Sequence, residues 1–566
     1  MKGRQDIRGA GGGEVERNSN HPGTRRRGSR IPFIAWAGVL LAAGGYLHGN
    51  NPSPTPTHGA AAARGILRIA RSTDPGALDP AKMVMSEDMM LSSLLHLPLL
   101  DVTNGLQLVP CGAASWTSSA DHRVHAFRLR PGVTFSNGRP VTAADYAYSL
   151  ERVLSPATAA PLGNVLHGLK GAGAFMQGRT SHVAGITAKG PLELVLELDA
   201  GDPMFGYRVA MPLAAPVPRE EVERAGVAFG NKPVGNGPYR IQRWRRGVQL
   251  RLEPNPYYQG PTPRLLDGVD LMIGGDDALH LMMFERGELD IANIMVVGIP
   301  IPSFRRISAD PRWKGWIESR PLLGTGFLSL NTEMPPLDNV LVRRAINHAI
   351  DRRRRMRIDL GYTRHAEGPI PSGMPAADPG LRGYAYDPSR ARELLRESGL
   401  PLPLRTALWY QTGEEMKVAA EGFQWDLKQV GIEAELREVT SAQLWSASTT
   451  RGQVPITFTG WTAGIPDPVD ILGMTLDGTS IDHPPHNNQA FYNNPRVNHL
   501  LHEAAAEVSM PRRHQLYREA ERLIVADAPW VFLGHYNQYG LRQPWIRGRL
   551  LETLVPLRFD RLSIAR

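Results

Sequence analysis

Cysteine is almost absent from this chain of 566 residues, in which Cys111 is the only one. A single cysteine excludes an intramolecular disulfide, a cysteine-based zinc site and a CxxC redox pair. It also predicts no lipoprotein anchor, because an acylated cysteine would have to follow an apolar leader. Cys111 has no histidine beside it in the sequence, so we interpret it as a structural thiol.

Catalytic and nucleotide-binding motifs are missing as well. The serines lack a GxSxG elbow, and the glycine-rich stretches lack a Walker lysine and the GxGxxG spacing. His483 and His486, with Asp482, do not have the spacing of a metal-binding pair, and His499 and His502 share a helical face that we expect to be exposed. The sequence therefore predicts no enzyme, no metal site and no cofactor.

Positive charge is concentrated at the start of the chain. The net charge is +9, yet residues 1–64 hold nine Lys/Arg against three acidic residues, so the remainder is nearly balanced. A nucleic-acid-binding body would need its own basic stripe. The densest run, Arg352–Arg355, would point in all directions from a helix, which favours a solvated helix end over a phosphate site. We predict no nucleic-acid partner.

The N-terminal part has the order of an export or anchoring segment. A basic segment, 1–30, precedes an apolar run, 31–47, and a Pro/Ala-rich linker, 48–64. The apolar run is short for a membrane span and slightly long for the core of a signal peptide. Export to the periplasm with cleavage is the first expectation, and an uncleaved tether in the inner membrane is the alternative.

The most informative stretch is 126–154, AFRLRPGVTFSNGRPVTAADYAYSLERVL. It reads as a short strand, two turn dipeptides and a helix that starts at a capping box, Thr142 to Asp145. The helix would bury one face, made of Tyr146, Leu150, Val153 and Leu154. The pattern alone predicts a strand–turn–helix unit and nothing more.

The amino-acid sequence of this stretch resembles the signature of the bacterial extracellular solute-binding proteins of the peptide/nickel family (family 5). There, an L-R-x-G-x-x-F-x-[DN]-G-x-x-x-[ST]-A-x-D block is followed by S-L-x-R. Other stretches resemble further motifs of that family in the expected order: 74–80, 233–239, 252–260, 286–290 and 327–352. The resemblance runs from about Gly65 to the C-terminus.

The resemblance implies an α/β protein with the two-lobe periplasmic-binding-protein fold of cluster C type and an extra inserted α/β domain. The residues independently predict a βαβ unit, with a strand at 404–410, a helix at 413–430 and a strand at 432–439. By resemblance, the domains are lobe I in three parts (65–100, 232–325 and 530–566), the inserted domain (101–231) and lobe II (326–529).

The same resemblance implies which residues approach the cleft between the lobes. Two methionines follow the opening turn, and five residues belong to the segment GWTAGIPDP. The predicted ligand-binding residues are Met83, Met85, Gly460, Trp461, Thr462, Gly464 and Asp467. The backbone of this segment would pair with a ligand as an added strand. Trp461 is equally compatible with ordinary core packing.

Residue 464 bears on the class of ligand. In peptide-binding members of the family, an aspartate three residues after the tryptophan holds the ligand's α-amine. Gly464 stands at that position here. An ammonium group in a dry cleft requires a counter-charge, so we expect weak binding of unmodified peptides unless Asp467 substitutes.

We therefore predict a monomeric binding protein that captures a small molecule, such as a peptide, for the permease subunits of an ABC importer. A non-peptide ligand is the alternative, such as an opine, an oligosaccharide or a metal chelate. The other alternative is a membrane-tethered sensor or assembly protein that kept the fold.

Overall fold

The computed structural model describes residues 65–83, 86–261, 263–292, 299, 301–483, 486–554 and 558–565. The predicted signal or anchor at 31–47 and the candidate ligand residue Met85 lie outside the described residues. Within the described ranges, no helix has both the length and the apolar composition that crossing a membrane requires.

A four-stranded sheet joins segments that are far apart in the chain. Its strand order is β1 (Ile66–Arg71), β10 (Gly268–Ile273), β9 (Gln249–Pro254) and β8 (Tyr239–Arg245). Only β1 and β10 run parallel. Side chains from α2 (Ser86–Leu95) and from the C-terminal residues Trp545 and Phe559 complete its core. The beginning, middle and end of the chain therefore share one hydrophobic core.

A second core lies beside this sheet. It takes side chains from α7 (Asp277–Glu285), α8 (Ile301–Ala309), Trp313 and Leu541. A short pair of strands near the C-terminus, β17 (Ile546–Arg547) and β18 (Ser563–Ile564), is antiparallel.

Residues between β1 and β8 form a separate antiparallel sheet with its own core. Its order is β4 (Ala113–Ser118), β5 (Val124–Leu129), β7 (Glu193–Glu197) and β6 (Ile186–Ala188). The predicted strand–turn–helix is confirmed: α3 (Ala143–Leu154) begins where the Asp145 carboxylate accepts hydrogen bonds from the Thr142 N–H, at 2.8 Å, and from its hydroxyl. The predicted inner face of α3 is buried.

Short elements complete this region. They are the hairpin β2 (Leu100–Val102) and β3 (Leu108–Pro110), and the helices α4 (Ala172–Met176), α5 (Phe205–Arg208) and α6 (Arg219–Ala225). Cys111 is buried, and burial raises the pKa of its thiol to about 12, as expected for a structural thiol.

A six-stranded sheet forms the other large part of the structure. Its order is β12 (Thr363–Arg364), β16 (Trp530–Leu541), β11 (Ile317–Leu330), β15 (Ile456–Thr462), β13 (Leu404–Gln411) and β14 (Ile432–Val439). The predicted βαβ unit is confirmed, because β13 and β14 run parallel and α12 (Glu414–Gln429) connects them.

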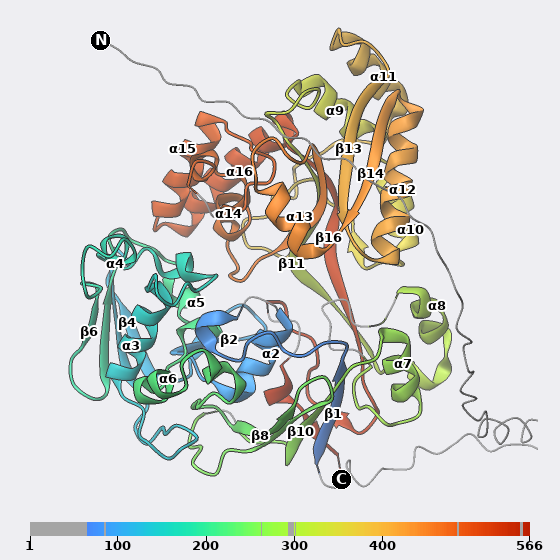
Figure 1. The fold of residues 1–566 in the computed structure, drawn as a ribbon. Helices are drawn as coiled ribbons and strands as arrows, with labels where there is room; N and C mark the ends of the chain where they lie inside the picture. Colours follow the sequence, from blue (N-terminus) through green and yellow to red (C-terminus); the bar gives the residue numbers. More distant parts are fainter. Residues whose placement is uncertain are drawn as a thin grey trace, which may run out of the picture. The chain divides into compact units, whose positions relative to one another are not determined.

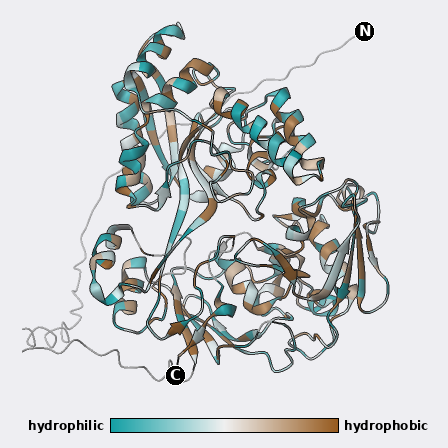
Figure 2. Ribbon diagram, turned by 180° about the vertical axis from the view of Figure 1, so that it is seen from behind, coloured by the Kyte–Doolittle hydropathy of each residue, from teal (hydrophilic) through white to brown (hydrophobic). Residues whose placement is uncertain are grey.

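Helices cover both faces of this sheet (Figure 1). One core is packed by α9 (Val340–Ala349), α11 (Pro388–Glu397) and α12, and the other by α14 (Leu472–Leu476), α15 (Pro495–Ala506) and α16 (Met510–Asp527). The helices in Figure 2 carry teal and brown bands side by side, as helices with one buried face do.

Two strands of this sheet are much longer than the rest. Strands β11 and β16 pair antiparallel from Ile317 with Leu541 to Ser329 with Trp530, and the register shifts between Pro321 and Phe327. Beyond the end of β16, the Gln543 N–H donates to the Asp290 carbonyl at 2.9 Å, so β16 leads directly into the segment beside β1. Figure 1 shows both strands running from the six-stranded sheet toward β1 and α7.

The arginine run lies on α10 (Arg352–Ile358) and is not uniformly solvated. The prediction is wrong for Arg352, which is buried, with guanidinium bonds to the carbonyls of Phe532 and Tyr384 at 2.7 and 2.8 Å. Burial lowers the pKa of Arg352 to about 10. The carbonyls that accept these bonds come from distant segments, which a local charge pattern does not reveal.

Candidate functional site

Strand β15 has an unpaired edge at its C-terminal end. Along one side, Ile456–Thr462 pairs with Leu330–Gly324 of β11. On the other side, only Ile456 and Thr457 pair, with Leu408 and Trp409 of β13. No strand of the described chain pairs with Thr459–Thr462 on that side. An unpaired edge offers backbone donors and acceptors to an added strand.

A tyrosine side chain packs so closely beside this edge that only glycine fits at two positions of the backbone. A Cβ at Gly460 would collide with the Tyr536 hydroxyl, and a Cβ at Gly324 would lie 2.7 Å from Tyr536 Cδ2. The Tyr536 side chain therefore lies against the backbone of β11 and β15, where β11 also changes register. Burial raises the pKa of Tyr536 to about 12.

Two tryptophan rings stack next to the edge. Trp461 of β15 and Trp445 of α13 (Ser441–Ser448) have ring centroids 6.4 Å apart and planes inclined by 25°. Trp445 is 43% exposed, whereas Trp461 is half-buried against the core of α14–α16. The indole nitrogen of Trp461 is buried and has no acceptor among the described residues. The pair presents an aromatic surface beside an unpaired backbone.

The turn after β15 is held by two aspartates. Asp467 is fully buried, and its carboxylate oxygens accept from Nε and Nη2 of Arg513 at 2.8 Å each. Asp467 also caps the short 3-10 turn Pro468–Asp470. Asp470 accepts from the N–H groups of Gly464 and Ile465. The negative charge of Asp467 is therefore already balanced by Arg513 and needs no ligand as its partner.

The structure brings together most of the predicted ligand residues. Gly460, Trp461, Thr462 and Gly464 lie at the end of β15 or in the turn after it, and Gly464 is exposed. Met83 is 2% exposed within the core of the four-stranded sheet. Its burial gives Met83 a packing role, and its predicted contact with a ligand stays a prediction.

Sequence reasoning missed Trp445 and Asp470. Trp445 reaches Trp461 only because α13 lies against β13, a tertiary contact without a local signal. Asp470 lies three residues after Asp467 in the same turn and only six residues after Gly464. This short separation in the sequence could have indicated that Asp470 lies close to Gly464.

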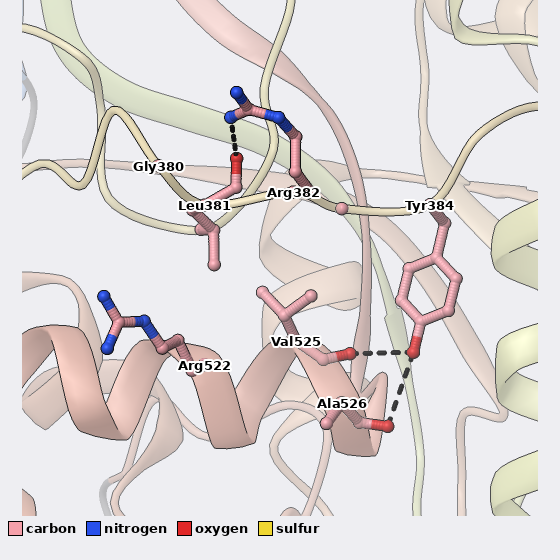
Figure 3. Close-up of a pocket in the computed structure, with 8 residues that line it drawn as sticks. Gly380, Leu381, Arg382, Tyr384, Arg522, Val525 and Ala526 are labelled. Carbon is pink, nitrogen blue, oxygen red and sulfur yellow. Dashed lines mark hydrogen bonds between the residues drawn. The ribbon is translucent and has the colours of Figure 1, made fainter.

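A separate hollow of about 380 Å³ lies between the loop Gly380–Tyr384 and the end of α16 (Figure 3). The Tyr384 hydroxyl donates to the Val525 carbonyl at 2.9 Å, and Arg522 pairs with Asp378 at 2.6 Å. The Tyr384 hydroxyl caps a carbonyl in the last turn of α16, and the ion pair joins the same helix to the segment before the loop, so both contacts serve structure at that end of α16.

The histidines near 483 do not form a metal site in the described chain, where no three His, Cys, Asp or Glu side chains are grouped to hold an ion. His486 is buried beside Phe491, and burial lowers its pKa. Asp482 pairs with Arg451 at 3.1 Å.

Comparisons with known proteins agree with this architecture. A model of the family "Bacterial extracellular solute-binding proteins, family 5 Middle" matches residues 107–483. The glutathione-binding protein GsiB of Pectobacterium atrosepticum is 27% identical over 464 residues, covering 81% of this chain and 86% of that protein. The oligopeptide-binding protein OppA of Bacillus subtilis is 26% identical over 460 residues, covering 78% and 82%.

A solved structure supports the fold directly. The clavulanic acid biosynthesis oligopeptide binding protein 2 superimposes with a TM-score of 0.81 at 26% identity, covering 89% of this chain and 96% of that chain. The fold is thus the two-lobe α/β fold of periplasmic binding proteins, as the sequence predicted.

Proposed function

Because the chain belongs to the bacterial extracellular solute-binding proteins of family 5, we propose that it captures a peptide-like solute between two lobes and delivers it to an ABC importer. Its relatives are named for binding glutathione and oligopeptides, which are both peptide-like. A ligand that is itself a short peptide can form backbone hydrogen bonds with a strand edge.

The unpaired edge of β15 carries this proposal. No described strand pairs with Thr459–Thr462 on one side, and the stacked rings of Trp445 and Trp461 lie beside it. An extended peptide would add to this edge, and one of its side chains would rest on the exposed face of Trp445. An opine, an oligosaccharide or a metal chelate lacks the repeating amide groups that such an edge pairs with, which favours a peptide-like ligand.

In this proposal, the two lobes and the inserted domain have the boundaries predicted from the sequence. Lobe I holds 65–100, 232–325 and 530–566, lobe II holds 326–529, and 101–231 is the inserted domain. Strands β11 and β16 would form the hinge, because their register shift lies between residues 321 and 327, where Gly324 and Gly326 contact Tyr536.

The remaining partners follow from the family. A protein of this class works outside the cytoplasm as a monomer and docks on the permease subunits of its importer. The basic and apolar segments 1–30 and 31–47 would export the chain or tether it to the inner membrane. A sensor that kept the fold would bind the same solute without an importer, and importer genes beside its own gene would argue against that role.

Mass spectrometry of small molecules released on denaturing protein purified from its native host tests the proposal. Short peptides or peptide conjugates are the expected result. Recovery of one sugar, or of no solute at all, would contradict peptide capture.

Trp461→Ala is expected to weaken binding of a captured peptide by about 1–3 kcal/mol, because the ring is a central aromatic contact. Titration calorimetry measures this loss, and thermal unfolding checks that the variant still folds. Trp425→Ala is a matched control, because Trp425 is 54% exposed on the far helix α12. This variant should bind the peptide normally. If the Trp461→Ala protein unfolds readily and its folded fraction binds the peptide normally, the ring packs in the core and does not contact the ligand.

A further inference from the structure

The hairpin β2–β3 has a leucine at a position where hairpins usually have glycine. The Thr103 N–H donates to the Gln107 carbonyl at 2.8 Å, so three residues, Asn104, Gly105 and Leu106, connect the strands. Leu106 has a φ of 61°, in the left-handed region. Three-residue connections favour glycine at such a position, because a side chain is strained at positive φ. A leucine here therefore needs contacts elsewhere in the fold that offset the strain.

The contacts of Leu106 reach beyond its own hairpin. Its side chain is half-buried and packs against the core of α14–α16, which belongs to the proposed lobe II. Its carbonyl accepts a hydrogen bond from the Tyr207 hydroxyl of α5 at 2.6 Å. The neighbouring Asn104 side chain accepts from Arg320 Nη1 of β11 at 3.0 Å. The inserted domain thus fixes the backbone of the tip, while the leucine side chain lies against another lobe.

Two further contacts join the same two parts of the chain. A Cβ placed on Gly464 would lie 3.4 Å from Met211 Cε, and a Cβ placed on Gly201 would lie 3.3 Å from Val508 Cγ1. In the proposed division, Gly464 and Val508 belong to lobe II, and Met211 and Gly201 belong to the inserted domain. Leu106 therefore lies in an interface between the inserted domain and lobe II.

The next leucine of the hairpin has a different place. Leu108 packs against the core of the inserted domain itself, where a Cβ on Gly206 would lie only 2.5 Å from Leu108 Cδ1. The two leucines, two residues apart, thus contribute to different cores. Substitutions at the two positions can separate the stability of the inserted domain from its contact with lobe II.

We infer that Leu106 is a latch that holds the inserted domain against lobe II when the lobes close, an inference that rests on the proposed capture between two lobes. Opening the lobes would return the Leu106 side chain and the surface beneath it to water, which the hydrophobic effect opposes. The latch favours the closed state before a ligand contributes any contact, so a ligand needs less binding energy to complete closure.

Crosslinking of the ligand-free full chain tests the latch. The double variant Gly464→Cys/Met211→Cys is treated with a bismaleimide that has a short spacer. The rate of crosslinking, followed by mass spectrometry, reports how often the inserted domain and lobe II are in contact. Cys111 is buried, and the two single-cysteine variants measure any reaction at that thiol.

Three changes at Leu106 are made in this double variant. Leu106→Gly removes the side chain and relieves the strain at positive φ, so the hairpin stays folded, and crosslinking should slow by about twofold or more. Leu106→Asp places a charge against an apolar core and should slow crosslinking by about tenfold or more. Leu106→Met keeps an apolar side chain of similar size and should crosslink at nearly the original rate.

Leu108→Ala is the matched control. It leaves a cavity in the inserted domain, so it should lower the temperature of thermal unfolding but leave the crosslinking rate unchanged. Crosslinking that is equally fast with Leu106, Leu106→Gly and Leu106→Asp, or equally slowed by Leu108→Ala, would overturn the latch. Absence of crosslinking in the parent double variant would overturn it as well. No ligand enters this test, so these results would leave peptide capture standing.

Discussion

Replacing Arg513 with alanine is expected to destabilise the protein by about 3–5 kcal/mol. The Asp467 carboxylate has no exposed surface and would lose both guanidinium bonds while remaining buried. The Ala505 carbonyl would lose a bond of 2.9 Å as well. Urea denaturation followed by circular dichroism measures the change in the free energy of unfolding.

Arg512→Ala is the control for this prediction. Arg512 is the neighbouring residue on α16, and its exposed guanidinium pairs with Glu503 at 3.1 Å. Its loss should change the free energy of unfolding by less than about 1 kcal/mol. If Arg513→Ala cost no more than Arg512→Ala, the buried pair would not hold the turn that contains Gly464 and Asp470.

Glu521→Gln is expected to stabilise the protein at alkaline pH. Glu521 on α16 is buried, one carboxylate oxygen accepts from the Ile370 N–H at 3.0 Å, and the other has no partner among the described residues. Burial raises its pKa from the ordinary 4.5 to about 8. The folded protein therefore keeps a proton between these pH values that the unfolded chain has lost, so stability falls as pH rises through this window.

The glutamine variant should lack this contribution to the pH dependence. Below pH 4.5 the two proteins should differ little, and at pH 8.5 the variant should be more stable by roughly 2 kcal/mol or more. Urea midpoints measured from pH 4 to 9 provide the comparison. Glu519→Gln, a half-exposed neighbour on the same helix, should keep the native pH profile. Parallel profiles for Glu521→Gln and the native protein would contradict the prediction.

Local patterns predicted the local elements well. The capping box at Thr142 and Asp145 fixed the start of α3, because both partners lie within one helical turn. The βαβ unit around α12 was recognisable because hydrophobic periodicity changes from strand to helix and back within a few residues.

Contacts between distant segments were not predictable in the same way. Asp467 and Arg513 are 46 residues apart, so nothing near Asp467 signals that its charge is already neutralised. Met83 looked like a cleft residue by its place after a turn, yet it packs into a core assembled from three parts of the chain. The unpaired edge of β15 also depends on where β13 stops pairing, which only the sheet shows.

The buried ion pair and the candidate site are parts of one arrangement. Arg513 holds Asp467, Asp467 caps the turn, and the turn orients Asp470 and Gly464 beyond the end of β15. Arg513→Ala should therefore also weaken binding of a captured peptide, through the position of this turn rather than through contact with the ligand.

Small-angle X-ray scattering tests the central claim of solute capture by two lobes. The full chain is measured alone and at saturation with the tripeptide that it binds most tightly in titration calorimetry. Closure of the lobes on the ligand predicts a smaller radius of gyration in the bound state. An unchanged radius at saturation would contradict capture by closure.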